Sequence, residues 1–171
     1  MERRDRGPAD KPPPGDLKSA CRGEAPMSAQ RKAEAWWEND LLHGSGKVKG
    51  HSGVLPEMGI SWSARTEELN GKTSPEELLA AAHASCFSMA FSNTLAKLGK
   101  PPQRVHVTAT VTFDKVGDGW SVTTVDLAVT GKVPGATAAQ FDEAAKTAST
   151  TCPISRALKG NVEIRVSSRL E

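Results

Sequence analysis

The sequence predicts an α+β fold, and three patterns in its 171 residues predict it. The first is a long apolar helix from Thr73 to Gly99. The second is a pair of strands, 104–113 and 120–130, joined by a glycine-containing turn. The third is a group of short strand-like segments before the helix, which indicates an antiparallel meander. A chain of this length has room for a single globular domain that contains all three.

The long helix has both a start and a stop signal. Ser74, Pro75 and Glu77 supply an N-cap hydroxyl, a first-turn proline and the glutamate of a capping box. Gly99 is placed to take the left-handed conformation that ends a helix, and Pro101 follows it. Almost all residues between are Ala, Leu, Phe, Met, Ser or Cys. We therefore expect a helix of roughly 36 Å that has no broad polar face and is covered on most sides.

Three short segments before the helix have the composition of strands. They cover 32–38, 47–52 and 60–66, and the second follows a Gly-Ser-Gly turn signal. We expect them to form the antiparallel meander. Arg65 then lies near the end of the third strand, where the simplest interpretation of a single arginine is a solvated surface charge.

After the helix, segment 104–113 alternates apolar and polar residues with a period of two. This pattern predicts a strand with one buried and one solvated face. His106 falls on the solvated face and needs no functional explanation. The partner strand, 120–130, breaks the alternation once, which predicts a β-bulge near Thr123.

The last third of the chain contains a second helix and a closing strand. Thr137 is placed to cap the helix, which runs into a Ser-Thr-Thr stretch ahead of Cys152 and Pro153. A residue before proline leaves helical geometry, while proline is favoured at the first position of a helix. We therefore expect Cys152 at the N-cap of a short helix, 153–158, with an alternating strand around Ile164 after it.

Composition limits the classes of function. A net charge of +2 indicates neither a nucleic-acid partner nor an anionic surface. No apolar run reaches the ~18 residues of a membrane span, and no signal-peptide core precedes Met27. We therefore expect a cytoplasmic protein. Residues 1–26 hold five of the eleven prolines and many charges, so we expect a disordered tail ahead of a domain at 27–171.

The three cysteines, Cys21, Cys86 and Cys152, are too few, and odd in number, for a secreted disulfide scaffold. In a reducing compartment, the thiols that matter are usually catalytic, redox-active or metal-binding. Cys21 falls in the predicted tail and is given no role. Cys86 and Cys152 lie on two different helices without a CxxC motif, which suggests that they meet only in the fold.

A reactive cysteine needs a stabilised thiolate, because a free thiol with a pKa of about 8.5 is mostly protonated at neutral pH. The start of a helix supplies this stabilisation at Cys152. Cys86 lies about three turns inside its helix and needs a cation from elsewhere. His83, one turn before it, is one candidate, although a histidine on an alanine-rich helix is more often a packed core residue. Arg65 is the better electrostatic candidate because it does not lose its proton.

Zinc binding is the rival chemistry. Cys86, His83, Cys152 and a further histidine would make four ligands. None of them has the usual two-cysteine knuckle spacing, however, and two ligands near the middle of a buried helix are unusual for a zinc site.

Five segments together resemble the OsmC/Ohr family of bacterial cysteine-dependent peroxidases, and most of all its OsmC branch. They are AWWEND, GSGKV, TSPEELLAAAHASCFSMAFS, VPGATAAQF and TTCPISRAL. The resemblance extends from Arg31 to the C-terminus. It implies an intertwined homodimer in which antiparallel sheets wrap around long central helices, with two active sites at the subunit interface.

The resemblance also implies roles for single residues. Cys86 matches the peroxidatic cysteine, which attacks a peroxide oxygen and becomes a sulfenic acid, and Cys152 matches the resolving cysteine that condenses with it to a disulfide. Arg65 matches the arginine that stabilises the thiolate, and Glu76 the acid that orients this arginine. Glu76 precedes Cys86 by about 15 Å of ideal helix, so we expect it to act through Arg65.

These implications predict a thiol-dependent peroxidase for organic hydroperoxides and hydrogen peroxide, active in oxidative or osmotic stress defence. We expect a dithiol reductant, for example of the lipoyl type, a homodimer, and no cofactor, nucleic acid or membrane partner. Two alternatives stay open. One is a non-catalytic module that binds a small hydrophobic ligand between its helices, and the other is a stress-associated interaction protein that uses its proline-rich tail.

Overall fold

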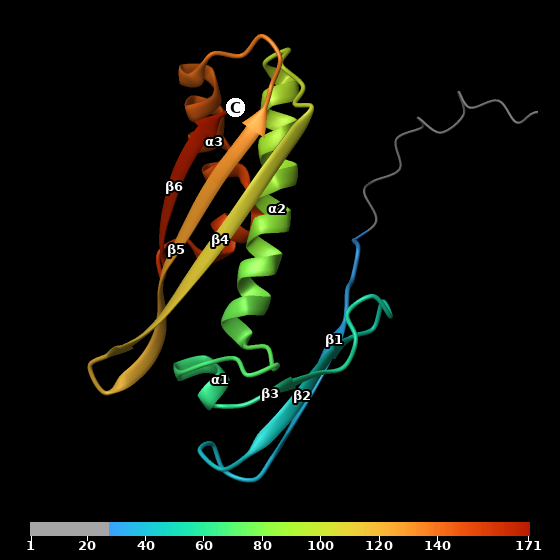
Figure 1. Ribbon diagram of the computed structural model, residues 1–171, viewed down its shortest axis with the longest axis vertical. Coiled ribbons are helices and arrows are strands. Elements are labelled where there is room, and N and C mark those ends of the chain that lie inside the picture. Colours follow the sequence, from blue (N-terminus) through green and yellow to red (C-terminus); the bar gives the residue numbers. More distant parts are fainter. Residues whose placement is uncertain (1–27) are drawn as a thin grey trace, which may run out of the picture. The chain divides into compact units, whose positions relative to one another are not determined.

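The computed structural model describes residues 28–171, and Lys32–Glu171 form one compact unit (Figure 1). The predicted tail at 1–26, Cys21 and the predicted domain start at residue 27 lie outside the described residues. The elements along the chain are β1 (Ala33–Glu38), β2 (Ser45–Gly50), β3 (Met58–Ile60), α1 (Ser63–Thr66), α2 (Pro75–Lys97), β4 (Arg104–Val116), β5 (Gly119–Lys132), α3 (Ala138–Thr151), α4 (Pro153–Leu158) and β6 (Glu163–Leu170).

A three-stranded sheet in the order β4–β5–β6 supports the core. β4 and β5 pair antiparallel, and Gly117, with φ of 62°, makes the tight turn between them. The register shifts where Phe113 pairs with Val122 after Thr112 has paired with Thr124, so Thr123 is the extra residue. This confirms the predicted bulge. β6 pairs with β5 in parallel, which makes the sheet mixed, whereas the sequence predicts antiparallel sheets. The crossover through α3 and α4 permits this pairing.

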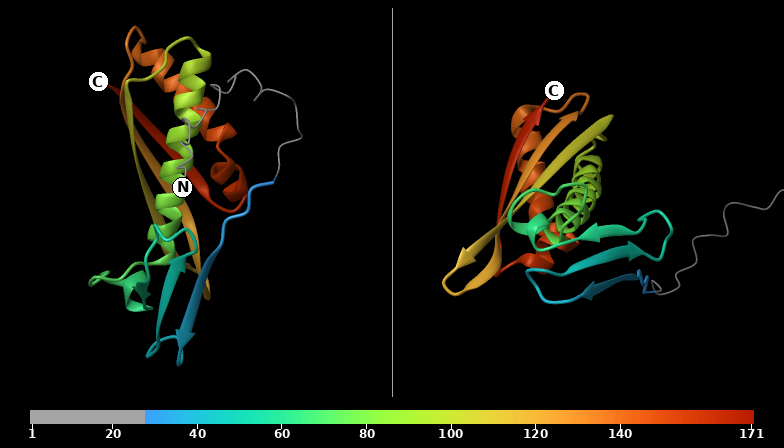
Figure 2. Two further views of the ribbon diagram at one scale, coloured as in Figure 1. Left: turned by 90° about the vertical axis from the view of Figure 1, so that its right-hand side faces the viewer. Right: turned by 60° about the horizontal axis from the view of Figure 1, so that its bottom comes forward.

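Helices α2 and α3 cover the same face of this sheet (Figure 2). α2 packs against β4, and α3 packs against both β6 and α2. The ring of Phe91 on α2 meets that of Phe141 on α3 edge to face, with 4.9 Å between the centroids. The buried apolar cluster between the helices and the sheet comprises Phe87, Phe91, Leu95, Val125, Leu127, Val129, Val133, Phe141, Ala144, Ala145, Ala148 and Cys152.

The ends of α2 agree with the sequence signals. The hydroxyl of Ser74 caps the helix by accepting a hydrogen bond from the backbone N–H of Glu77 at 3.1 Å, and Pro75 is the first helical residue. The Glu77 carboxylate accepts a hydrogen bond from the Thr73 hydroxyl at 2.5 Å, and the return bond of a capping box to Ser74 is not formed. Gly99, with φ of 70°, follows the last turn.

The expectation that α2 is covered on most sides holds only in part. Within residues 28–171, a stripe along the helix stays exposed at Ala82, Ser85, Met89 and Asn93. The side chain of Met89 is 68% exposed. Although α2 is largely apolar, no helix within residues 28–171 is both long enough and apolar enough to span a membrane.

The three N-terminal strands form a separate antiparallel sheet in the order β1–β2–β3, as the sequence predicts. A parallel bridge between Ile60 and Thr73 links it to the segment that leads into α2. All six residues of β1 are exposed. The large side chains of Trp36 and Trp37 on this strand are each 37% exposed.

The prediction of a strand over 60–66 is wrong after its first residue. β3 ends at Ile60, and Ser63–Thr66 form the single helical turn α1. The Ser61 hydroxyl accepts a hydrogen bond from the N–H of Ala64 at 3.3 Å, which favours this turn over a strand ladder. Over a stretch as short as 60–66, an alternation of apolar and polar residues is compatible with either a strand or a helical turn. Arg65 therefore lies on a helix and not at a strand end.

The junction of α3 and α4 follows the sequence signals closely. Thr137 and Gln140 form a full capping box at the start of α3. Cys152 is both the C-cap of α3, with its N–H bonded to the carbonyl of Ala148, and the N-cap of α4, which starts at Pro153. The predicted position of the thiol at the start of a short helix is confirmed.

Replacing Thr137 with alanine is expected to lower the free energy of unfolding by about 1 kcal/mol. The Thr137 hydroxyl accepts from the N–H of Gln140 at 3.2 Å, and the Gln140 side chain accepts from the N–H of Thr137 at 3.0 Å. Thr137→Ser keeps the oxygen and serves as the matched control. Denaturant unfolding measures both variants, and an equal loss in the two would contradict the role of the cap.

Candidate active site

The thiols of Cys86 and Cys152 meet in the fold, although 66 positions separate them, and their Sγ atoms are 3.1 Å apart. Cys86 comes from the middle of α2 and Cys152 from the junction of α3 and α4. Both are free thiols, Cys86 partly exposed and Cys152 fully buried. The sulfurs are about 1 Å beyond the length of a disulfide bond, so a small movement suffices to join them.

The surroundings of Cys152 favour a thiolate. Burial raises the pKa of the Cys152 thiol, but the neighbouring backbone N–H of Ser155, the Cys86 thiol, the Ser155 side chain and the N–H of Ile154 together lower it below its ordinary value. Two of these groups are amides in the first turn of α4, which have no partner within their own helix. The start of α4 therefore favours the thiolate of Cys152, as the sequence predicts.

The surroundings of Cys86 disfavour a thiolate in the single chain. Burial raises the pKa of the Cys86 thiol, the N–H of Ile154 opposes this rise, and the neighbouring Cys152 adds to it. Cys86 opens into a hollow of about 350 Å³, lined also by Met89, Ala90, Asn93, Thr151 and Pro153. None of these lining residues is charged. Cys86 thus has room for a reactant but lacks a cation.

Arg65 and Glu76 form a second group. The Arg65 Nη2 atom lies 2.6 Å from Glu76 Oε1, and Nε lies 3.1 Å from the same oxygen. Both side chains are largely buried, Glu76 more than Arg65. The pairing that the resemblance implies is thus present. This pair lies in its own hollow of about 350 Å³ between α2 and β4, and the hollow shares no residue with the one at Cys86.

Aromatic rings that sequence reasoning missed surround Arg65. Its guanidinium carbon lies 4.2 Å from the centroid of the Phe113 ring and 5.7 Å from that of Trp62. Phe113 in turn stacks on Trp120. Trp62 is the N-cap of α1, three positions before Arg65, whereas Phe113 and Trp120 come from the end of the β4–β5 hairpin. Only the fold brings the hairpin to Arg65, so no local pattern signals the Phe113 and Trp120 rings.

His83 is buried and does not supply the missing cation. Its exposed fraction is 0%, and burial lowers its pKa, so the ring is neutral near neutral pH. Its Nε2 atom lies 2.8 Å from the hydroxyl oxygen of Ser155, while Nδ1 has no hydrogen-bond partner among the described residues. Sequence reasoning missed Ser155. Its position three residues after the N-cap Cys152, in the first turn of α4, was the available signal.

The alternative of a zinc site needs several ligands in one place. Among residues 28–171, no three His, Cys, Asp or Glu side chains are grouped so that they could hold a metal ion. His83 instead turns Nε2 toward a serine hydroxyl.

Comparisons with known proteins agree on one family. The family model described as OsmC-like protein matches residues 68–167. Peroxiredoxin OsmC of Escherichia coli (strain K12) is 40% identical over 138 residues, which are 81% of this chain and 96% of that protein. Organic hydroperoxide resistance protein OhrA of Bacillus subtilis (strain 168) is 31% identical over 122 residues, 70% of this chain and 84% of that one.

The fold agrees with the same family. The crystal structure of an organic hydroperoxide resistance protein from Elizabethkingia anophelis, with thiocyanate bound, superposes with a TM-score of 0.67 at 24% identity. The match covers 85% of this chain and 100% of that one. The family model spans more than half of the chain, and the matched residues include the segments TSPEELLAAAHASCFSMAFS, VPGATAAQF and TTCPISRAL. The chain therefore belongs to the family of OsmC-like proteins.

Proposed function

We propose that this protein is a thiol-dependent peroxidase that reduces organic hydroperoxides and hydrogen peroxide, with Cys86 as the peroxidatic and Cys152 as the resolving cysteine. The observation that carries the proposal is the 3.1 Å contact between a partly exposed and a fully buried thiol. The names of its curated relatives, a peroxiredoxin and an organic hydroperoxide resistance protein, point to the same activity. A non-catalytic module with inert, separately packed thiols is not favoured.

The oxidative half of the cycle follows from these positions. The Cys86 thiolate attacks one oxygen of the hydroperoxide, the S–O bond forms as the O–O bond breaks, and the leaving alkoxide takes up a proton to become an alcohol. Cys86 is then a sulfenic acid. The Cys152 thiolate attacks the Cys86 sulfur, and the displaced hydroxide is protonated to water. Met89, Ala90 and Pro153 give the hollow an apolar wall for the organic group.

Arg65 supplies the cation that Cys86 lacks, and Glu76 orients Arg65. A guanidinium stays charged at every relevant pH and offers several donors to the thiolate and to the oxygen that becomes negative as the O–O bond breaks. The bonds at 2.6 and 3.1 Å hold the Arg65 guanidinium in one orientation while it faces the ring of Phe113.

A second copy of the chain brings Arg65 to Cys86. Within one chain the two residues open into different hollows, and Glu76, which Arg65 contacts, precedes Cys86 by about 15 Å of helix. A homodimer also accounts for two exposed surfaces among the described residues, namely the stripe on α2 that contains Met89 and the strand β1 that contains Trp36 and Trp37. Each complete site then takes Cys86 and Cys152 from one chain and Arg65 and Glu76 from its partner.

For the reductant we propose a small dithiol of the lipoyl type, because the hollow at Cys86 has a volume of only about 350 Å³ and is largely apolar. The physiological role proposed is defence against oxidative or osmotic stress. The cytoplasmic location stays a prediction from the sequence.

Cys86→Ser is expected to abolish peroxide consumption, because Cys86 is the one cysteine within residues 28–171 that lines the hollow. Cys21→Ser is the matched control and should keep full turnover. An assay with cumene hydroperoxide and hydrogen peroxide side by side, with dihydrolipoamide, thioredoxin or glutathione as reductant, measures this and ranks the substrates. Full turnover by the Cys86→Ser variant would refute the proposed activity.

Cys152→Ser is expected to leave a sulfenic acid on Cys86, because the thiol 3.1 Å away that would condense with it is gone. After one exposure to peroxide, dimedone should label Cys86 in this variant, as read by peptide mass spectrometry. The wild-type protein should form the disulfide instead and remain unlabelled. Equal labelling of both proteins would exclude Cys152 as the resolving cysteine.

Arg65→Ala is expected to lower turnover by about 10² to 10³ fold, the usual effect of removing a donor from developing negative charge. Heterodimers of differently tagged chains then test which chain supplies Arg65. Cys86→Ser on one chain and Arg65→Ala on the other should restore activity, because the intact arginine serves the partner's intact thiol. With both substitutions on one chain and none on the other, activity should be lost. The reverse pair of results would place Arg65 in the same chain as its thiol.

A further inference from the structure

Two pairs of side chains join α2 to the start of α4. The Sγ atoms of Cys86 and Cys152 are 3.1 Å apart, and the Nε2 atom of His83 lies 2.8 Å from the hydroxyl oxygen of Ser155. On α2 the two members are three positions apart, which places them on one face, one turn from each other. Cys152 is the N-cap of α4 and Ser155 its third residue. His83 and Ser155 are 0% and 2% exposed, so the second pair is buried.

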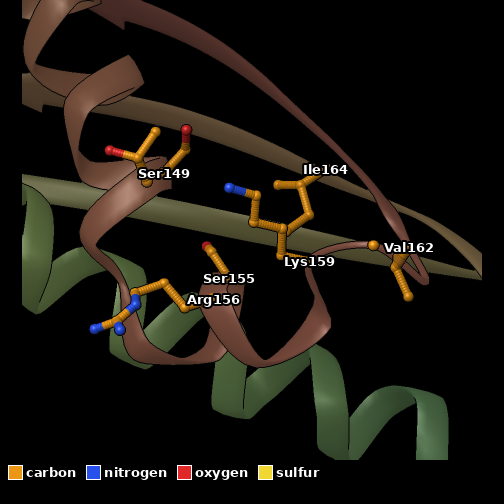
Figure 3. A pocket seen from close by; sticks show the side chains of 8 residues that line it. Ser149, Ser155, Arg156, Lys159, Val162 and Ile164 are labelled. Atoms are coloured by element: carbon orange, nitrogen blue, oxygen red, sulfur yellow. The ribbon is translucent and has the colours of Figure 1, made fainter.

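The position of α4 depends on contacts of this kind. α4 has six residues, and a helix this short is not stable by itself. Its apolar residues Ile154 and Leu158 pack against the buried cluster, but apolar contact does not define one orientation. Beside α4 lies a hollow of about 340 Å³, whose lining comes from the end of α3, from α4 and from the chain between α4 and the start of β6 (Figure 3). α4 therefore has space into which it can shift.

The hydrogen bond between His83 and Ser155 has one favoured direction. Burial lowers the pKa of His83, so the ring is neutral and carries a single N–H. Its Nδ1 atom has no hydrogen-bond partner among the described residues. A buried acceptor without a partner is tolerated better than a buried N–H without one. We therefore assign the proton to Nε2, which donates to the Ser155 hydroxyl oxygen.

We propose that His83 and Ser155 are positioning residues for the resolving step, because their hydrogen bond holds α4 on α2 and keeps the Cys152 sulfur within reach of the oxidised Cys86. This inference rests on the proposed peroxidase function and concerns the closure of its disulfide. Two contacts one turn apart prevent α4 from rotating on α2, whereas the sulfur contact alone acts as a pivot. Oxidation of Cys86 alters the sulfur contact but leaves the hydrogen bond between His83 and Ser155 intact. Groups held in place in this way react faster with each other.

The fate of the Cys86 sulfenic acid reports how well the two sulfurs are held. In the productive reaction the Cys152 thiolate attacks the Cys86 sulfur, the S–S bond forms, and the S–O bond breaks to give water after protonation. In the competing reaction the sulfenic sulfur attacks an oxygen of a second hydroperoxide, a second S–O bond forms, and the O–O bond breaks to release an alcohol. Cys86 is then a sulfinic acid, which thiols do not reduce. The fraction of Cys86 lost in each turnover therefore rises as the productive reaction slows.

Two variants of His83 provide the main test, in the full-length protein that also carries Cys21→Ser. His83→Asn is too short to reach Ser155 and should slow disulfide formation about three- to tenfold, the effect of losing one hydrogen bond. His83→Gln places an amide N–H near the former Nε2 and should restore most of the rate. Rapid quenching after one equivalent of peroxide, followed by mass spectrometry, measures the formation of the sulfenic acid and of the disulfide separately. The rate of sulfenic acid formation should not change.

Variants of Ser155 need a different design, because its side chain also lowers the pKa of Cys152. Ser155→Ala should slow disulfide formation for two reasons, and only one of them depends on His83. Adding His83→Asn to Ser155→Ala should cause no further slowing, since the hydrogen bond is already absent. Ser149→Ala is the matched control, because this hydroxyl lines the same hollow but donates to the carbonyl of Lys146. It should leave the rate unchanged.

Overoxidation provides the second measurement. With peroxide in excess, the fraction of Cys86 lost as sulfinic acid in each turnover should rise in His83→Asn by the factor by which disulfide formation slows. In His83→Gln it should stay near the level of the parent protein. If His83→Asn fails to fold, as judged by circular dichroism, the comparison of Ser155→Ala with Ser155→Thr, which keeps the hydroxyl, decides the question by the same measurement.

Three results would overturn the inference. They are an unchanged rate of disulfide formation in His83→Asn, equal slowing by His83→Gln, and equal slowing of sulfenic acid and disulfide formation, which would indicate general damage to the site. None of them affects the proposed peroxidase, which fails only if Cys86 is dispensable.

Discussion

The contact between the two sulfurs depends on how α2 crosses the start of α4. Cys86 sits far from either end of α2, where the backbone hydrogen bonds of the helix hold it in place. Cys152 sits at the cap between α3 and α4, where Pro153 and the carbonyl of Ala148 fix the backbone on both sides. The Sγ–Sγ separation of 3.1 Å is therefore set by the packing of helices and not by a flexible loop. The remaining features of the site modify the chemistry of these two atoms.

The electrostatic surroundings shift the pKa values of the two thiols in opposite directions. Amides at the start of α4 and the Ser155 hydroxyl lower the pKa of Cys152 in spite of its burial, whereas burial raises the pKa of Cys86. Because the two thiols are in contact, a negative charge on one opposes a charge on the other. The single chain thus prepares the buried sulfur to carry charge and leaves the accessible one neutral. An arginine from a partner chain would reverse this preference at the step where peroxide is attacked.

Local signals in the sequence predicted much of the fold. The caps at Ser74 and Thr137, the bulge at Thr123 and the thiol before Pro153 are all present, because each depends on residues within a few positions. The α1 turn and the parallel pairing of β6 were not predicted, since a short alternating stretch suits two conformations and strand order depends on distant segments.

Contacts between distant segments were also the part of the candidate active site that the sequence did not predict. A partnership of the two cysteines was suggested by their number and their helices, but their roles, and those of Arg65 and Glu76, came from the resemblance to a family. The hydrogen bond between His83 and Ser155 joins residues 72 positions apart, so only the crossing of α2 and α4 reveals it. The ring of Phe113 beside Arg65 was not predicted for the same reason.

Closing a disulfide between Cys86 and Cys152 would also change the free energy of unfolding of the protein. The bond would join the central helix to the α3–α4 junction and close a loop of 66 positions. A cross-link over such a loop restricts the unfolded chain and stabilises the folded one by about 4 kcal/mol in the chain-entropy model. The oxidised protein would then resist unfolding better than the reduced one. Exposure to peroxide would thus raise the stability of the folded protein until a reductant opens the disulfide.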